Sequence, residues 1–142
     1  MSLEANKTLY RRIVEEVWNS CNLEVVDEFI DTNCIFHTFD KDLRGPKQFR
    51  QYAEELLTVF PDIHFTIEDL IAERDRVVSH WTATGTQKGE FMEIPATNKN
   101  VKFQGATILR MVRGKVVELW AYWDRISVMK QLGDATQPAR VR

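Results

Sequence analysis

The sequence of 142 residues contains no long apolar run. No segment approaches the ~18–20 consecutive apolar residues that a transmembrane helix requires. The N-terminal segment is polar and lacks the apolar core of a signal peptide. We therefore expect a cytoplasmic protein that does not act at a membrane.

Cysteine, histidine and glycine are also scarce. Cys21 and Cys34 have no CxxC spacing, which favours buried free thiols. No two of His37, His64 and His80 are spaced as a helical pair of metal ligands. The six glycines form neither a phosphate-binding loop nor a GxSxG motif. These absences argue against metal, nucleotide and serine-nucleophile enzymes, so we expect no metal site.

Charge of neither sign dominates the chain. The net charge is −2, the pI is near 5.9 and the basic residues are scattered. We therefore expect no nucleic-acid partner. The hydrophobic fraction of 44% is ordinary for a soluble globular protein. The length suits a single domain, which we place at residues 1–133, followed by a disordered polar tail at residues 134–142.

The first half of the chain has helical periodicity. Apolar residues at i, i+4 spacing predict a helix over residues 3–20. Asn22 can cap a second, short helix, and residues 46–60 form a third apolar stripe that ends before a proline. Between them, residues 34–39 read as a strand and residues 40–45 as a loop.

The second half has a period of two. This pattern predicts strands at residues 63–73, 76–87, 101–112 and 114–124. Helices followed by antiparallel strands indicate an α+β fold. The last strand is apolar on both faces, and the helices can cover only one face of the sheet. We therefore expect a homodimer in which a second copy covers the other face.

The last strand ends in the sequence Trp120-Ala121-Tyr122-Trp123-Asp124, which a short helix over residues 125–132 follows. An aspartate in this place has two possible roles. It can cap the helix N-terminus, or it can act as an acid/base group in an apolar pocket.

The final hairpin carries two charges near its middle, Arg110 and Glu118. A three-residue turn at residues 113–115 would place them opposite each other, on the face shared with Trp120 and Tyr122. A two-residue turn would place them on opposite faces. We prefer the paired register, because an unpaired charge in a covered sheet is costly.

Several short motifs occur in an order and spacing that one family shares. They are Glu15-Glu16-Val17-Trp18-Asn19, His37, Phe60-Pro61-Asp62, Trp81-Thr82-Ala83-Thr84-Gly85-Thr86, Pro95-Ala96-Thr97 and the C-terminal pattern Arg110, Gly114-Lys115-Val116, Glu118, Trp120, Asp124, Gln131-Leu132-Gly133. With these motifs the chain resembles the SnoaL-like polyketide (ester) cyclase family, in the nuclear-transport-factor and ketosteroid-isomerase-like superfamily. The resemblance runs from about Lys7 to Gly133.

The resemblance implies a cone-shaped α+β barrel, usually dimeric, with N-terminal helices packed on a curved, mainly antiparallel sheet around an internal pocket. It implies that Asp124 is the general acid/base of an intramolecular aldol ring closure, with His37 in the same pocket and no cofactor. Burial against Trp120 and Tyr122 would raise the pKa of Asp124 toward neutrality. His37 could donate a hydrogen bond to a substrate carbonyl.

The sequence departs from the family pattern at Gln87, where many relatives have histidine. Glutamine can orient a ligand but cannot transfer a proton at neutral pH. His80 and Trp81 alternate on a predicted strand, so one should line the pocket and the other the dimer face or the core. We take Trp120, Tyr122, Gln87, His80 and Trp81 as candidate substrate-binding residues.

These observations favour a cofactor-independent cyclase-type enzyme that acts on a small, carbonyl-bearing, polyketide-like substrate. Two alternatives stay open. One is a different proton-transfer reaction in the same pocket, such as isomerisation, dehydration or epoxide hydrolysis. The other is a dimeric module that binds a small ligand without turning it over.

Overall fold

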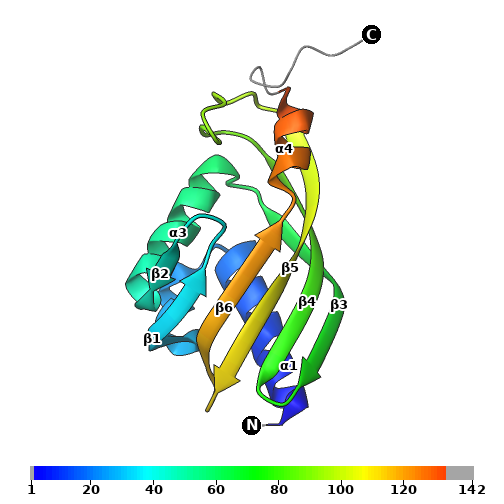
Figure 1. The fold of residues 1–142 in the computed structure, drawn as a ribbon. Helices are drawn as coiled ribbons and strands as arrows, with labels where there is room; N and C mark the ends of the chain where they lie inside the picture. Colours follow the sequence, from blue (N-terminus) through cyan, green and yellow to red (C-terminus); the bar gives the residue numbers. More distant parts are fainter. Residues whose placement is uncertain (1, 134–142) are drawn as a thin grey trace.

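The computed structural model describes residues 2–133 (Figure 1). Six strands form one mixed sheet in the order β2-β1-β6-β5-β4-β3. The strands are β1 (Ile30–His37), β2 (Asp42–Arg44), β3 (His64–Glu73), β4 (Arg76–Thr86), β5 (Asn100–Val112) and β6 (Lys115–Trp123). The helices are α1 (Leu3–Arg12), the π-helix η1 (Ile13–Asn19), the 3-10 turn η2 (Leu23–Val25), α2 (Val26–Phe29), α3 (Gly45–Val59) and α4 (Arg125–Leu132). The α+β prediction is confirmed.

The helices begin and end where the sequence predicts. Ser2 caps α1 by accepting a hydrogen bond from the Ala5 amide (3.0 Å), and α1 continues directly into η1. Asn22 caps η2, and the first turn of α3 contains a proline. The predicted helices at residues 3–20, after residue 22 and at 46–60 are therefore confirmed.

Strands β3 to β6 form an antiparallel meander. The prediction of a loop at residues 40–45 is wrong, because β2 lies there and pairs with β1. The strand predicted at residues 34–39 covers only part of β1, which begins at Ile30 and pairs in parallel with β6. Strand β2 has only three residues, and the part of β1 before residue 34 is also short. An alternation with a period of two cannot be recognised in segments of this length.

The helices α1, η1 and α3 pack on the inner face of the sheet, and α4 lies at the end where β6 terminates (Figure 1). On β4, buried and exposed residues alternate, and the buried set includes Val77, Ser79 and Trp81. The opposite, outer face is uncovered in the monomer and exposes Ile71 and Tyr122, which are 63% and 58% accessible.

The two cysteines differ in environment. Cys34 is buried, and burial raises the pKa of its thiol to about 12. Cys21 is exposed, so the prediction that both thiols are buried is wrong for this one. The helices within residues 2–133 are all too short or too polar to cross a membrane. The predicted tail at 134–142 lies outside the described residues.

Candidate functional site

An apolar cavity of about 70 Å³ lies between the helices and the inner face of the sheet. Strand β6 contributes Leu119, Ala121 and Trp123 to its wall. Nine of its lining residues are aromatic: Tyr10, Trp18, Phe36, Phe49, Tyr52, Phe65, Trp81, Phe103 and Trp123. Such a lining suits a flat, largely apolar ligand.

A second hollow of about 160 Å³ adjoins the first and forms its mouth. The two share five lining residues, namely Phe36, Tyr52, Leu56, Ala121 and Trp123. The mouth adds polar groups that the inner cavity lacks, among them Thr38, Glu55 and Arg125. Glu55 is exposed, so this end opens toward solvent.

Arg125 is the cation at the mouth. Its Cζ lies 3.7 Å from the centroid of the Phe39 ring and 5.6 Å from that of the Trp123 ring. Burial lowers the pKa of its guanidinium. Arg125 joins none of the ion pairs formed among residues 2–133. A guanidinium held between aromatic rings, without a carboxylate partner there, can bind a ligand oxygen that carries negative charge.

Tyr52 lines both the inner cavity and the mouth. Burial raises the pKa of its phenol, against smaller lowering effects of the Trp123 side chain and the Arg125 charge. Tyr52 is therefore a neutral hydroxyl donor at neutral pH. Together, Tyr52 and Arg125 provide the donors that a carbonyl or an enolate oxygen requires.

Trp81 and His80 lie on opposite faces of β4, as the alternation predicts. Trp81 lines the inner cavity, and its Nε1–H donates to Thr107 Oγ1 at 2.9 Å. Gly105 lies opposite Trp81 in the sheet, and a side chain there would clash with the indole. His80 lies on the outer face between Asp69 and Gln104, so its placement as a substrate-binding residue is wrong.

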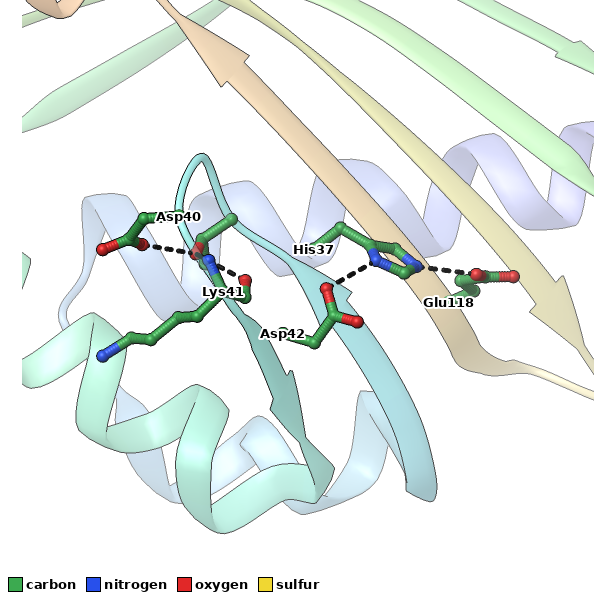
Figure 2. Close-up of polar contacts among 6 residues, drawn as sticks. His37, Asp40, Lys41, Asp42 and Glu118 are labelled. Carbon is green, nitrogen blue, oxygen red and sulfur yellow. Dashed lines mark hydrogen bonds and ion pairs between the residues drawn. The ribbon is translucent and has the colours of Figure 1, made fainter.

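His37 lies on the outer face between two carboxylates (Figure 2). Its Nδ1 is 2.8 Å from Asp42 Oδ1 and its Nε2 is 2.7 Å from Glu118 Oε2. The hydrogen bond to Glu118 is the main cause of a raised His37 pKa, and the same bond is the main cause of a lowered Glu118 pKa. The two groups therefore form an ion pair. The expected place of His37 on the pocket wall is wrong.

Arg110 and Glu118 are paired, as predicted, with Arg110 Nε 3.5 Å from Glu118 Oε1. The turn, however, has only two residues, Arg113 and Gly114, both with positive φ. Met111 pairs with Val116 but Arg110 pairs with Glu118, so Val117 is an extra residue on β6. This bulge restores the register that a two-residue turn alone would have broken.

Trp120 and Tyr122 also lie on the outer face, so their predicted place in the pocket is wrong. Trp120 stacks on His37 with ring centroids 5.1 Å apart, and Tyr122 is 58% exposed. The alternate residues of β6, Leu119, Ala121 and Trp123, line the cavity instead. Both sets are apolar, so the sequence pattern could not show which set faces the helices.

Asp124 is the N-cap of α4. Its Oδ1 accepts a hydrogen bond from the Ser127 amide at 2.9 Å, and the residue is exposed. Neither the inner cavity nor the mouth includes Asp124 in its wall. The structure thus shows the capping alternative, and the expected placement in an apolar pocket is wrong. The acid/base role that the resemblance implies stays a prediction.

Gln87 is fully buried and holds the segment between β4 and β5 together. Its Nε2 donates to the carbonyls of Gly89 and Ile94, both at 3.0 Å. Its Oε1 accepts from the amide and the hydroxyl of Thr97, at 3.0 and 2.6 Å. With four hydrogen bonds inside the protein, Gln87 has a structural role, and it lines neither the inner cavity nor the mouth. Its contact with substrate stays a prediction.

Sequence reasoning did not identify the polar residues that do face the hollow. Tyr10 was part of an apolar helical stripe, and Tyr52, Glu55 and Arg125 were not singled out. The sequence does contain one indication that Arg125 is near the site, because Arg125 directly follows the candidate residue Asp124 at the end of β6. Among residues 2–133, no group of three His, Cys, Asp or Glu side chains could hold a metal ion.

Comparison with known proteins identifies relatives of this architecture. The sequence model of the SnoaL-like polyketide cyclase family matches residues 8–132. A search of curated proteins found no match. AclR from Streptomyces galilaeus, a proposed hydroxylase, superposes with a TM-score of 0.84 and 28% identity over 96% of this chain and 100% of its own.

Two proposed polyketide cyclases are similarly close. The protein from Acidithiobacillus ferrooxidans has a TM-score of 0.81 and 28% identity, covering 96% of this chain and 100% of its own. IdmH from Streptomyces antibioticus has a TM-score of 0.78 and 25% identity, covering 89% and 96%. On the evidence of the family match and of these structures, the chain belongs to the SnoaL-like polyketide cyclase family.

Proposed function

We propose that this protein is a cofactor-independent cyclase that closes a ring in a small, carbonyl-bearing, polyketide-like substrate by an intramolecular aldol reaction. The observation that supports this most is the aromatic cavity with Arg125 and Tyr52 at its mouth. The cavity would bind the apolar body of the substrate, and the mouth would hold a carbonyl oxygen.

The reaction needs a base and a stabilised enolate. The base removes a proton from a carbon beside one carbonyl, and Arg125 and Tyr52 donate hydrogen bonds to the enolate oxygen that forms. The enolate carbon then attacks a second carbonyl of the same molecule. One carbon–carbon bond forms, and the new alkoxide takes up the proton.

Two carboxylates compete for the role of base. Glu55 lies in the wall of the mouth, and Asp124 matches the family position but caps α4. We propose Glu55 from the geometry and retain Asp124 from the resemblance, which also implies a histidine, His37, in the same pocket. His37 lies on the outer face and lines neither hollow, so we expect His37→Gln to leave turnover unchanged.

The test uses 2,6-heptanedione, a small diketone that closes to 3-hydroxy-3-methylcyclohexanone. Ring closure is followed by NMR with wild-type protein, Glu55→Gln and Asp124→Asn. Loss of the base should lower the rate by roughly 10²–10⁴-fold, because this is the usual contribution of an acid/base group. Absence of wild-type turnover with this and longer diketones would contradict the proposal.

A non-catalytic binding role is the second candidate. The wall of the inner cavity carries no carboxylate and no histidine among the described residues. A protein that binds aromatic ketones with full affinity, yet closes no ring, would establish this role. AclR, the proposed hydroxylase, illustrates that a relative of similar fold is assigned a different reaction.

We also propose a homodimer formed through the outer face of the sheet. Ile71, Val78 and Tyr122 expose large apolar side chains there. Static light scattering at micromolar concentration should give about twice the chain mass of 16.6 kDa. A monomer at all concentrations would contradict this assembly.

A further inference from the structure

Polar side chains from three elements meet at the inner end of the cavity, in the part that Arg125 does not line. Tyr10 on α1 and Thr107 on β5 line the cavity there. Ser79 on β4 lies directly opposite Thr107 in the sheet. Ser79 belongs to the buried set of β4 that includes Trp81, so its side chain points to the same, helix-covered face, although Ser79 does not itself line the cavity.

The hydrogen bonds of this group are incomplete. Trp81 Nε1–H donates to Thr107 Oγ1 at 2.9 Å, which leaves the Thr107 hydroxyl proton free for another acceptor. Ser79 is 0% exposed, and its Oγ has no partner within hydrogen-bonding geometry among the described residues. An unpartnered buried hydroxyl destabilises the fold, so its position requires an explanation.

Tyr10 completes the group as a neutral donor. The phenol is 4% exposed, and its burial raises its pKa, against smaller lowering effects of the nearby Ser79 and Thr107 hydroxyls. The proton therefore stays on Tyr10 at neutral pH. The inner end of the cavity thus offers hydroxyl donors and no charge.

We propose that this inner end is a binding subsite for an uncharged carbonyl oxygen of the substrate, which accepts hydrogen bonds from Tyr10 and Thr107. This inference rests on the proposed function and names its substrate more closely. The substrate carries two oxygens at separate ends of an apolar body. One lies at the mouth beside Arg125, and the other is buried against Tyr10.

A charged oxygen would not suit the inner end, because no cation lines it and burial of an unpaired charge is costly. A purely apolar end would leave the Thr107 hydroxyl proton without an acceptor. A carbonyl satisfies the available donors without bringing charge into the core. Tyr10 would in that case also stabilise the alkoxide when this carbonyl is the one attacked.

The experiment compares two ligands of the same shape, 1-tetralone and tetralin, which differ by one carbonyl. Affinities are measured by tryptophan fluorescence, and the C=O stretch of bound 1-tetralone is measured by infrared difference spectroscopy. The variants are Tyr10→Phe and Ser79→Ala. Tyr122→Phe is the matched control, because that tyrosine is exposed on the outer face.

We expect wild-type protein to bind 1-tetralone more tightly than tetralin. Tyr10→Phe should weaken 1-tetralone binding by roughly 3–10-fold, the usual contribution of one neutral hydrogen bond. It should leave tetralin binding unchanged and shift the C=O stretch to higher frequency. Ser79→Ala should leave 1-tetralone binding nearly unchanged, because Ser79 does not line the cavity, and should leave the free protein as stable or more stable, since it removes an unpartnered hydroxyl.

Several results would overturn the subsite. If both ligands bind equally, or if Tyr10→Phe leaves the C=O stretch unchanged, the cavity binds ligands but has no carbonyl subsite at Tyr10. If neither ligand binds to wild-type protein, the cavity is not the binding site, and the proposed function falls together with the subsite.

Discussion

Neighbouring residues on strand β4 meet very different surroundings. Trp81 lines the cavity on the inner face, while His80 hydrogen-bonds to Asp69 and Gln104 at the outer surface. The same contrast separates the faces of the whole sheet. The outer face has the histidines and paired carboxylates that resemble catalytic groups, and they satisfy one another.

The inner face has fewer reactive side chains but more unused hydrogen-bonding capacity. Ser79 has no partner, Tyr10 retains its proton, and Arg125 at the mouth has no ion pair within residues 2–133. The comparison teaches that a binding site is marked by groups that still lack partners beside a hollow. Residue type alone points to the wrong face here.

The two faces of the sheet should differ most in how far a substitution lowers the free energy of unfolding. Val77 is 0% exposed and Val78 is 37% exposed, although they are adjacent. Val77→Ala should lower the free energy of unfolding by about 2–3 kcal/mol, from lost burial and a new cavity. Val78→Ala, the matched control, should change the stability of the monomer by less than about 0.5 kcal/mol. Urea unfolding measures both, and equal effects would contradict the assignment of faces.

The next largest effect on stability is expected from substitutions of Asp124, which follows the end of β6. Asp124→Ala should cost about 1 kcal/mol through loss of the cap, while Asp124→Asn should cost almost nothing, since Asn caps as well as Asp. Thermal unfolding measures the two variants side by side. A fall in turnover with Asp124→Asn at unchanged stability would restore the acid/base role, whereas unchanged turnover would leave Asp124 as a cap.

A smaller, pH-dependent effect should come from the outer face. The raised His37 pKa stabilises the protein below the unfolded value of 6.5, and this contribution is lost as the pH rises through the folded value. The lowered Glu118 pKa stabilises it above 4.5, and this contribution is lost on acidification. The pair therefore contributes most between about pH 4.5 and 6.5.

Because both side chains are partly exposed, the contribution should be roughly 0.5–1 kcal/mol. Urea unfolding of wild type and Glu118→Gln at pH 5.5 and pH 8.5 measures it. The difference between the two proteins should be larger at pH 5.5. A difference that is larger at pH 8.5 would show that His37 is not held as the cation.

The smallest expected effect is zero. His37, Asp42 and Glu118 are the outer-face group that most resembles a metal site, yet they pair through hydrogen bonds, with Arg110 beside them. Dialysis against a chelator should leave the melting temperature and any turnover unchanged. Loss of either on chelation, with recovery on adding a divalent cation, would contradict a metal-free protein.

The sequence predicts the layout of this fold well, because its helices are long and regularly apolar and its meander strands alternate clearly. It does not predict the site, for two physical reasons. Strand β6 is apolar on both faces, so its pattern cannot decide whether Trp120 or Trp123 faces the helices. The bulge at Val117 then changes the register in a way that no spacing reveals.

The alternation of His80 and Trp81 predicts that they face opposite sides of the sheet but leaves open which one lines the pocket, and the structure has Trp81 in the cavity wall. The sequence does not decide the role of Asp124, because an aspartate at the end of a strand can either cap the following helix or face a pocket. Tyr10 and Tyr52 were missed because a tyrosine in a helical stripe has the same pattern as any other core residue.

The position of β6 has a consequence for how the chain acquires its structure. The last strand to be synthesised lies inside the sheet, where it pairs with β5 and, in parallel, with β1. Strands β3, β4 and β5 can assemble from contacts between sequence neighbours. The β1–β2 pair can join them only after residue 123 has been made, and closing such distant contacts is slow. A growing chain would therefore carry β1 and the apolar sides of its helices unprotected until β6 has been made, which makes this interval the one most exposed to aggregation.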